Sequence, residues 1–481
     1  MKRRDFLRSI GIGAAAWAVS GTGYALARDN SLAGSFEGTI VLGNATDCGI
    51  TLNVLSNKSL EVYFEYGTQL GIYTDQTLRS LIDPGLPFEC TIAELQPNTR
   101  YYYRLRFRQS GEGAFKTGPA YTFHTQRSPG TAFTFCVQGD SHPERHKKAF
   151  DRQLYDRTLR AALADRPDFY IMMGDDFSVD TIKPHEINAD LVTQRYLLQR
   201  DYLSVLSHST PLYLVNGNHE QAARYLLDGT SDNIAVWAQR ARNLLYPQPV
   251  PDSFYTGNEE PVEFIGHLEN YYAWTWGDAL FVTLDPYWSS PVPVDNVYGG
   301  GPKTSNKWDI TLGEAQYQWL KQTLEQSTAR WKFVFTHHIH GTGRGGVEVA
   351  GLYEWGGHAK KGAWEFNRRR PGWDLPIHQV MVQHGVTIFF QGHDHVFARQ
   401  ELDGVTYLTT PYPADPNYTA ANASRFLSGD VLPCSGYTRV TVNDASVKIE
   451  YVRTFLPGDE NDKQVNSQVE YTHTITDTDH N

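Results

Sequence analysis

The chain has 481 residues, of which 40% are hydrophobic and 13% aromatic, so it has enough apolar side chains to bury a core and is not expected to be disordered. Its formal net charge is −11 at pH 7. This acidic balance argues against nucleic acid or an anionic membrane surface as the main partner, because both bind clustered Lys and Arg. It still allows a local basic pocket for a small anion.

The amino terminus predicts an export signal over residues 1–27. Lys2, Arg3 and Arg4 precede an apolar run over 10–21, and Ala25-Leu26-Ala27 offers a small-x-small cleavage site. The apolar run is too short to span about 30 Å of hydrocarbon, so no stable membrane insertion is expected. The paired arginines resemble a twin-arginine signal. We therefore expect a bacterial protein that is periplasmic or secreted.

Residues 36–126 are expected to form a β-sandwich, because short stretches of strand character alternate with turn residues. The expected strands are 39–42, 49–55, 60–66, 88–94, 101–108 and 121–125. The segment 95–101, Leu-Gln-Pro-Asn-Thr-Arg-Tyr, resembles the tyrosine corner of fibronectin type III domains, in which a tyrosine hydroxyl bonds to nearby backbone. Cys48 and Cys90 lie in this region and are compatible with a disulfide and with separate thiols.

A linker over 126–131 leads into a region where apolar runs alternate with segments of helical character, which predicts an α/β domain over 132–456. Helices are expected at 147–164, 189–206, 234–245 and 312–326. Two stretches rich in Pro, Gly and Asn, 247–267 and 286–310, are expected to be long surface insertions that influence specificity. The polar stretch 459–481 is expected to be a flexible tail.

Five apolar runs in this domain each lead into potential metal ligands. The runs 133–137, 169–173, 212–215, 333–335 and 387–390 are followed by Asp140 and His142, by Asp175, by Asn218-His219-Glu220, by His337-His338, and by His393 and His395. Sites in open α/β sheets form beyond the carboxyl ends of the strands, so the five clusters should converge. One such cluster is an ordinary polar loop, whereas five in order predict a metal site.

The order Asp-x-His, Gly-Asp, Gly-Asn-His-Glu, a strand-end His and Gly-His-x-His resembles the calcineurin-like metallophosphoesterases, from residue 133 to about 396. A fibronectin-like domain in front of it is similar to purple acid phosphatases and their bacterial relatives. The resemblance implies a sandwich followed by a four-layer α/β/β/α domain. It also implies a first metal on Asp140, His142 and His395, a second on Asn218, His337 and His393, and Asp175 as the bridge. His337 is preferred to His338 because the family usually ligates through the first His of such a pair.

The ligand chemistry agrees with this family. Carboxylate, carboxamide and imidazole groups suit two divalent or trivalent ions such as Fe, Zn or Mn, among which the sequence leaves the choice open. Two ions about 3.5–4 Å apart activate a hydroxide for in-line attack on phosphorus. We therefore expect an exported hydrolase of small phosphate esters, with monoesters favoured and a phosphodiesterase as the alternative. A catalytically inactive binding or adhesion protein is the alternative of another class, and the oligomeric state is left open.

Residues beyond the ligands receive roles from the resemblance. His219 is expected to face the leaving oxygen and to donate a proton to it, as a catalytic residue beside Asp175. Asn218, His219 and Arg344 are expected to contact the substrate. For Arg344, in a glycine-rich segment without a P-loop ending, a plain solvent loop is the alternative. The same two interpretations apply to Arg145, His146 and His340.

The sequence also departs from the purple enzymes in two places. Ser178 stands where those enzymes have the tyrosine that colours their iron, and they lack the His that His142 supplies here. The chain therefore resembles the colourless binuclear branch of the family.

Overall fold

The computed structural model describes residues 36–146, 148–294, 304, 306–339 and 343–476. The predicted export signal over 1–27 and His340 lie outside these residues. Within the described ranges, no helix combines the length and the apolar character needed to cross a membrane.

The amino-terminal strands form two antiparallel sheets, as expected for a sandwich. Their bounds are β1 (Gly38–Gly43), β2 (Ile50–Ser56), β3 (Leu60–Gly67), β4 (Asp75–Gln76), β5 (Ser80–Ile82), β6 (Phe88–Ile92), β7 (Arg100–Gln109) and β8 (Lys116–His124). One sheet has the order β1-β2-β6, and the other has the order β4-β3-β7-β8 with β5 also paired to β3. Strand β7 alternates between buried and partly exposed residues, which is the pattern of a sheet with one face in the core.

Two details of the sandwich bear on the sequence predictions. The Tyr101 hydroxyl accepts a hydrogen bond from the Gln96 backbone N–H at 2.9 Å, so the predicted tyrosine-corner contact is confirmed. This contact and the two-sheet arrangement fit a fibronectin III-like domain. Cys48 and Cys90 are free thiols, so the structure has the separate thiols rather than the disulfide.

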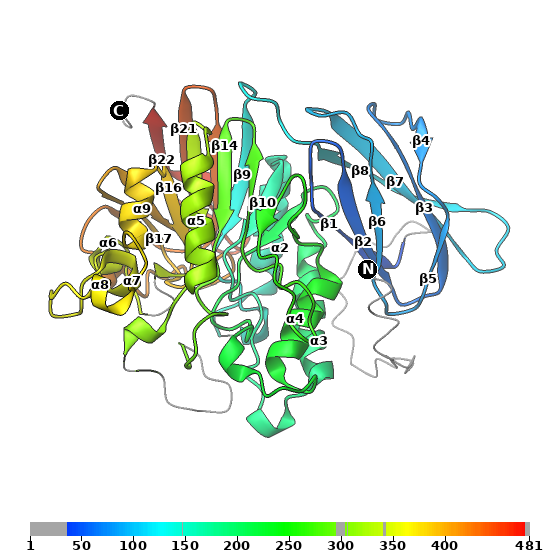
Figure 1. The fold of residues 1–481 in the computed structure, drawn as a ribbon. Coiled ribbons are helices and arrows are strands. Elements are labelled where there is room, and N and C mark those ends of the chain that lie inside the picture. Colours follow the sequence, from blue (N-terminus) through cyan, green and yellow to red (C-terminus); the bar gives the residue numbers. More distant parts are fainter. Residues whose placement is uncertain (1–35, 147, 295–303, 305, 340–342, 477–481) are drawn as a thin grey trace.

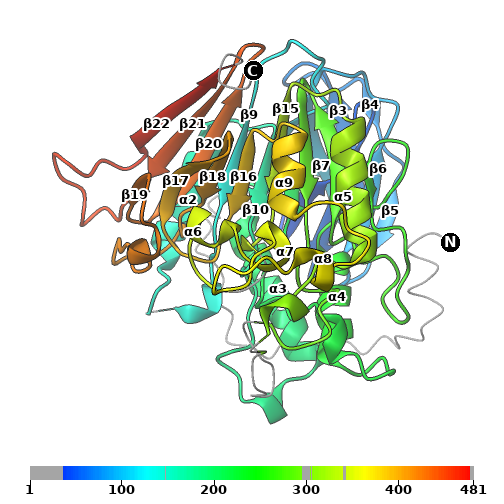
Figure 2. The same ribbon diagram turned by 60° about the vertical axis from the view of Figure 1, so that its left-hand side comes forward.

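The rest of the chain builds two further sheets that pack face to face (Figures 1 and 2). One sheet has the order β11-β10-β9-β20-β21-β22 and the other β12-β13-β14-β15-β16-β18-β17-β19. The first comprises β9 (Phe133–Gln138), β10 (Phe169–Met172), β11 (Leu212–Leu214), β20 (Gly436–Val442), β21 (Ser446–Arg453) and β22 (Gln468–Thr476). The second comprises β12 (Thr256–Gly257), β13 (Tyr272–Trp276), β14 (Ala279–Thr283), β15 (Trp331–Phe335), β16 (Ile388–Gln391), β17 (Phe397–Leu402), β18 (Val405–Thr409) and β19 (Asp430–Leu432).

Aromatic side chains fill the space between these sheets. The Phe135 ring lies 5.1 Å from that of Phe281 and 5.5 Å from that of Phe333, centroid to centroid. Such rings bury large areas and pack well edge to face. The strand-end loops therefore sit on a rigid double layer.

Helices cover the two outer faces. The helices α2 (Arg152–Ala164), α3 (Ala189–Leu203) and α4 (Ile234–Leu245) pack on the six-stranded sheet, and α5 (Glu314–Gln326) and α9 (Ile377–Gln383) pack on the eight-stranded sheet. Three short helices, α6 (Val347–Ala350), α7 (Tyr353–Gly356) and α8 (Phe366–Arg369), lie between α5 and α9 in the chain. Asp151 begins α2 by accepting a hydrogen bond from Leu154 N at 2.9 Å, which satisfies a free helix N–H. The predicted four-layer α/β/β/α arrangement is confirmed.

The carboxyl-terminal stretch differs from its prediction. Residues 468–476 form β22, which pairs antiparallel with β21 from Ser446 to Arg453, so the prediction of a flexible tail is wrong for them. The polar composition of this segment did not indicate a strand, because one face of this edge strand is exposed to solvent. The Tyr471 ring packs 5.2 Å from that of Phe397, and its hydroxyl donates to Asp430 at 2.7 Å.

The predicted insertion over 247–267 is more than a surface loop. Tyr255 is buried, and Thr256–Gly257 pair with β13 as strand β12 at the edge of the eight-stranded sheet. The second predicted insertion, 286–310, is described except for 295–303 and 305. Its first residues pack beside the strand-end loops, where the Tyr287 ring is 6.1 Å from that of His337.

Candidate metal centre

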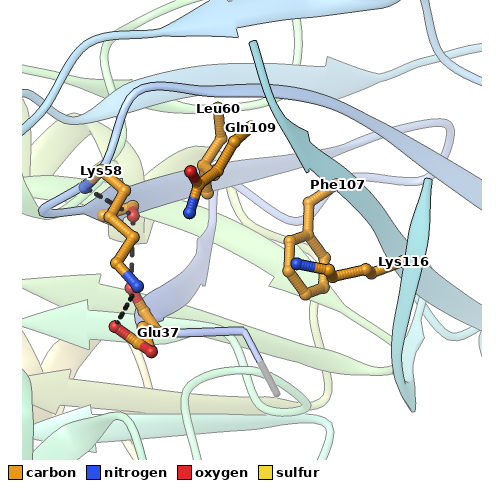
Figure 3. A pocket seen from close by; sticks show the side chains of 7 residues that line it. Glu37, Lys58, Leu60, Phe107, Gln109 and Lys116 are labelled. Carbon is orange, nitrogen blue, oxygen red and sulfur yellow. Dashed lines mark hydrogen bonds and ion pairs between the residues drawn. The ribbon is translucent and has the colours of Figure 1, made fainter. Parts of the chain in front are cut away.

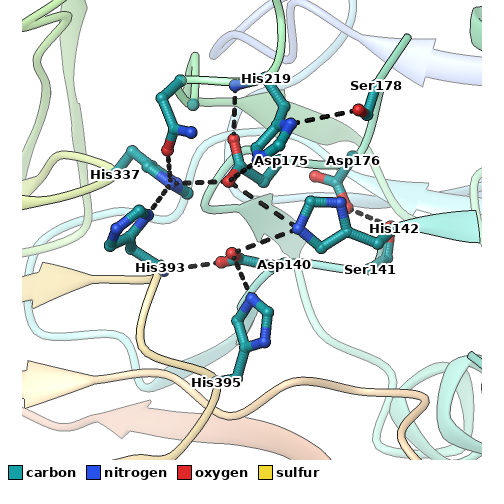
Figure 4. A network of polar contacts seen from close by, with 12 residues as sticks. Asp140, Ser141, His142, Asp175, Asp176, Ser178, His219, His337, His393 and His395 are labelled. Carbon is teal, nitrogen blue, oxygen red and sulfur yellow. Dashed lines mark hydrogen bonds and ion pairs between the residues drawn. The ribbon is translucent and has the colours of Figure 1, made fainter. Parts of the chain in front are cut away.

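The seven predicted ligands lie together, in the loops that follow five strands. Figure 4 labels all of them except Asn218. Strands β9, β10 and β11 run parallel, as do β14, β15 and β16, so their carboxyl ends meet at one edge of the double layer. Four of the ligands adopt left-handed backbone conformations, which are uncommon outside glycine and concentrate at functional sites. They are His142, Asp175, His393 and His395, with φ between 42° and 65°.

The first predicted group gathers around Asp140. Its Oδ2 atom is 2.9 Å from His395 Nε2 and 3.8 Å from His142 Nε2. Glu144 accepts a hydrogen bond from His142 Nδ1 at 3.1 Å, which leaves Nε2 of that ring for a metal. Each residue of the group offers one ligand atom, and these atoms lie within 4.8 Å of one another.

The second predicted group gathers around His337. Its Nδ1 donates to the Met173 carbonyl at 2.7 Å, so Nε2 faces the site. This Nε2 atom lies 3.1 Å from both Asn218 Oδ1 and His393 Nδ1. His338, the next residue in the chain, directs its Nδ1 atom to the Ile339 carbonyl instead. The geometry therefore favours His337 over His338.

Asp175 lies between the two groups. Its Oδ2 atom is 3.2 Å from His337 Nε2 in the second group and 3.9 Å from His142 Nε2 in the first. Its Oδ1 atom accepts a hydrogen bond from the His219 backbone N–H at 2.8 Å, which fixes the carboxylate plane. A carboxylate in this position suits the predicted bridging role.

The electrostatics of the cluster keep its two central carboxylates ionised. Burial alone would raise the pKa of Asp175, but His337 and His219 lower it to about 2. Burial likewise opposes ionisation of Asp140, and His395 and His337 nevertheless hold its pKa well below the usual value. Burial lowers the pKa of His142 well below the usual value of imidazole. Burial lowers the pKa of His337, but Asp175 and Asp140 outweigh it and raise that pKa to about 10, so this imidazole holds a proton until a cation takes its place. Ionised carboxylates and a neutral imidazole are the forms that bind cations.

The donor set therefore fits a pair of metal ions. Buried carboxylate and imidazole atoms from different loops point at a shared space, and these nitrogen and oxygen donors suit Fe, Zn or Mn ions better than copper(I) or an iron–sulfur cluster, which prefer thiolate. Buried carboxylates have lost their hydration and repel one another unless a cation or a proton lies between them. Either predicted ion would receive imidazole nitrogen together with oxygen donors.

Glu220 connects two of the ligand loops. Its carboxylate accepts hydrogen bonds from the backbone N–H groups of Asp175 and Asp176, each at 3.0 Å, and from Gly217 at 2.6 Å. A Cβ atom on Gly217 would lie 2.2 Å from Asp175 Oδ1, so only glycine permits this close approach. Sequence reasoning noted Glu220 within its motif but gave it no role.

His219 stands beside the cluster rather than within either predicted group. Its Nδ1 atom is 3.0 Å from Asp180 Oδ2 and 3.1 Å from Ser178 Oγ, while Nε2 is 3.7 Å from Asp175 Oδ2. Burial lowers the pKa of His219, but Asp175 and Asp180 outweigh it and raise the pKa to about 9. The ring also has a ligand atom within reach of His142 and Asp175, so its predicted role as a non-ligand stays a prediction.

Two further predicted residues, Arg344 and Arg145, lie at the rim. Arg344 donates to the His393 carbonyl at 2.6 Å and to Asp394 at 3.0 Å, so it is next to the centre and engaged with the protein. Arg145 lies beside His219, whose Nε2 atom is 3.5 Å from Arg145 Nη2. His340 lies outside the described residues.

Sequence reasoning missed Tyr412 altogether. Its ring is 4.8 Å from that of His395 and stacks on His142 at 6.1 Å. The hydroxyl is buried and has no hydrogen-bond partner among the described residues. Tyr412 follows an ordinary strand without any local polar pattern, so no signal in the sequence marks it.

The sandwich has a small pocket of its own, which contains none of the predicted site residues (Figure 3). Leu60 and Phe107 are its apolar lining residues, and Lys58 and Glu37, which also line it, form an ion pair at 2.8 Å. Its volume of about 150 Å³ and its exposed lysines distinguish it from the buried ligand cluster.

Comparison with known proteins agrees with this geometry. The calcineurin-like phosphoesterase family matches residues 133–397, which is more than half of the chain, so the chain belongs to that family. A search of curated sequences finds no match. Membership implies a dinuclear metal site and supports a hydrolase, and the clustered Asp and His residues agree with both.

Two solved structures share the fold. A purple acid phosphatase from yellow lupin seeds is 15% identical, with a TM-score of 0.56 over 91% of this chain and 74% of that one. The structure of PhoD is 14% identical, with a TM-score of 0.58 over 91% of this chain and 88% of that one. At these identities the likeness concerns the fold, which extends over the sandwich as well as the catalytic domain.

Proposed function

We propose that this protein is a binuclear-metal phosphatase that hydrolyses phosphate monoesters. The observation that carries the proposal is the convergence of seven predicted ligands, with the Asp175 carboxylate facing both groups. When bound, a pair of metal ions supplies Lewis-acid stabilisation of phosphoryl charge and a nucleophile at neutral pH. Asp140, His142 and His395 would hold one ion, and Asn218, His337 and His393 the other.

The residues around the ions have separate tasks in this proposal. Asn218 has a buried Nδ2 group without a hydrogen-bond partner among the described residues, and a phosphoryl oxygen would satisfy it. A buried unsatisfied donor costs about 1–3 kcal/mol, so substrate binding would recover that cost. His219, held by Ser178 and Asp180, would donate a proton to the leaving oxygen. Glu220 would hold the loops of Asp175 and Asn218 in fixed positions relative to each other.

The proposal is tested with p-nitrophenyl phosphate and bis-p-nitrophenyl phosphate on protein reconstituted with Fe, Zn or Mn. We expect the monoester to have the larger kcat/KM. A larger kcat/KM for the diester would favour a phosphodiesterase of the same fold. Turnover of neither compound by protein that holds two ions per chain would favour a binding protein instead.

We also propose that the chain acts outside the cytoplasm. Support comes from the charged segment, the apolar run and the cleavage pattern within residues 1–27. The paired Arg3 and Arg4 indicate twin-arginine export, which carries proteins that have already folded. Such a route suits an enzyme whose metals are inserted during folding.

A further inference from the structure

Arg145 lies at the rim of the metal centre because the chain turns back after His142. His142 has φ 42°, in the left-handed region, and the single 3₁₀ turn η1 (Pro143–Arg145) follows at once. Through this turn, Arg145 Nη2 comes within 3.5 Å of His219 Nε2. His219 Nε2 is in turn 3.7 Å from Asp175 Oδ2. The guanidinium of Arg145 is thus connected through His219 to Asp175, the carboxylate that faces both ligand groups.

The contacts of Arg145 with acidic side chains are long. Asp180 Oδ2 is 3.4 Å from Nη2, and Glu144 Oε1 is 3.5 Å from Nε. Charge-assisted N–H···O⁻ bonds are usually about 2.7–2.9 Å, so neither contact engages the guanidinium fully. A guanidinium has five N–H donors in a planar fork, and the Arg145 side chain is 27% exposed. Within the described residues it retains donors for a further anion.

Arg344, on another part of the rim, differs in this respect. Its Nη1 atom donates to the His393 carbonyl at 2.6 Å and to Asp394 at 3.0 Å, and Asp394 also accepts a hydrogen bond from Gly345 N at 2.7 Å. The charge of Arg344 therefore holds its own loop against the ligand loop. Of these two arginines, Arg344 has one nitrogen committed to short hydrogen bonds with its own loop and the ligand loop, whereas the polar side-chain contacts of Arg145 are all 3.4 Å or longer.

We propose that Arg145 binds the second negative charge of a phosphate monoester and thereby makes the site discriminate against diesters. This inference rests on the proposed phosphatase function and names the residue that selects the substrate class. Near neutral pH a monoester has close to two charges and three non-bridging oxygens, because its second pKa is about 6. A diester has one charge and two such oxygens. A bidentate guanidinium therefore gains more from the monoester.

The experiment compares Arg145→Gln, Arg145→Lys and the wild-type protein, all reconstituted with metal. Arg160→Gln is the matched control, because Arg160 also pairs with an aspartate, Asp156 at 2.7 Å, but lies exposed on α2. Calorimetry measures the Kd of inorganic phosphate. Steady-state kinetics give kcat and KM for p-nitrophenyl phosphate and for its bis ester, and elemental analysis gives the metal content.

We expect Arg145→Gln to retain both ions and to weaken phosphate binding about tenfold or more. KM for the monoester should rise, whereas KM for the diester should change less than twofold. Arg145→Lys should recover part of the phosphate affinity, and Arg160→Gln should behave as wild type. Equal losses on both esters, an unchanged phosphate Kd, or loss of metal would each overturn the inference, because Arg145 would then only hold its loop. Wild-type protein that binds phosphate but turns over neither ester would instead contradict the proposed function.

Discussion

At the scale of single residues, Asp175 holds the most demanding position in the centre. Its backbone has φ 56°, its Oδ1 atom accepts the His219 N–H, and its Oδ2 atom faces His337 and His142. Three requirements thus meet in one residue: a left-handed backbone conformation, a fixed carboxylate plane and an oxygen that faces both ligand groups. His219 next to it is held by two polar partners outside the ligand groups.

Replacing Asp175 with Ala should empty both metal positions, because each predicted group would lose a ligand and the remaining imidazoles would face one another. Elemental analysis of purified protein should then find well under one ion per chain. Asp156→Ala, which removes a carboxylate on α2, is the control and should keep the full complement. Two ions retained at full occupancy in Asp175→Ala would rule out the bridging role.

His219→Ala should keep both metals and bind phosphate nearly normally, since its side chain lies beside the ligand groups. General acid help is worth about 10²–10⁴-fold, and it matters most when the leaving group is a strong base. In side-by-side kinetics, the rate of hydrolysis should therefore fall far more for alkyl phosphates than for p-nitrophenyl phosphate. His185→Ala, at an exposed site, is the control. Equal losses on both substrates would mean that His219 positions phosphate, and loss of an ion would make it a ligand.

At the scale of secondary-structure elements, the centre depends on how strand-end loops are tied to one another. Strands β9, β10 and β11 run parallel, and Glu220 in the loop after β11 binds three backbone N–H groups. Two of these groups belong to the loop after β10. Beyond the last paired residues of these strands, the Glu220 carboxylate therefore accepts the backbone hydrogen bonds that a neighbouring strand would otherwise accept.

Glu220→Ala should lower metal affinity about 10–100-fold without removing any ligand, because partners behind the ligands contribute on that scale. Glu220→Gln, which retains one carbonyl acceptor, should lose less. Competition with a chelator of known affinity measures both variants against the wild type. Identical metal affinity in Glu220→Ala would show that the loops keep their geometry without this carboxylate.

At the scale of the whole molecule, the sandwich and the catalytic domain share a polar interface. Arg200 on α3 is fully buried and donates to Thr39 Oγ1 at 2.7 Å and to Asn53 Oδ1 at 2.8 Å, both in the sandwich. Tyr103 of the sandwich donates to the His208 carbonyl at 2.6 Å. Burial lowers the pKa of Arg200 to about 10, so this side chain remains charged at neutral pH. The sandwich is thus part of the support beneath α3.

Arg200→Met should destabilise the protein by about 3 kcal/mol, because several buried acceptors lose a charged donor at once. Urea denaturation followed by tryptophan fluorescence measures the change in the free energy of unfolding. The exposed Arg160→Met is the control and should change it by less than about 0.5 kcal/mol. A midpoint for Arg200→Met equal to that of the wild type would mean that the two domains are held together elsewhere.

Changing Arg3 and Arg4 to Lys should leave the precursor in the cytoplasm, because the twin-arginine route requires the paired arginines. Immunoblots of periplasmic and cytoplasmic fractions from the expressing bacterium measure the distribution. A variant with Lys2 changed to Arg retains the pair and should be exported normally. Periplasmic accumulation of the double variant at the wild-type level would indicate a different route.

Much of the fold and of the ligand set was predictable from the sequence because the signals are local. Each ligand cluster follows an apolar run, and glycine precedes four of the clusters, so strand, turn and ligand appear within about ten residues. The alternation of such runs with helical segments predicted the layers, and the predicted helices correspond to α2, α3, α4 and α5. These features depend on neighbours in the chain, which composition and spacing reveal.

Tertiary structure alone decided the features that join distant segments. Tyr412 reaches His142 and His395 across the site, Arg145 meets His219, and β22 completes a sheet that begins at β11. None of these has a local pattern, because a contact between residues far apart in the chain imposes no spacing on the sequence around either partner. The sequence determined which side chains could bind metal, and the packing of two sheets decided which other groups stand beside them.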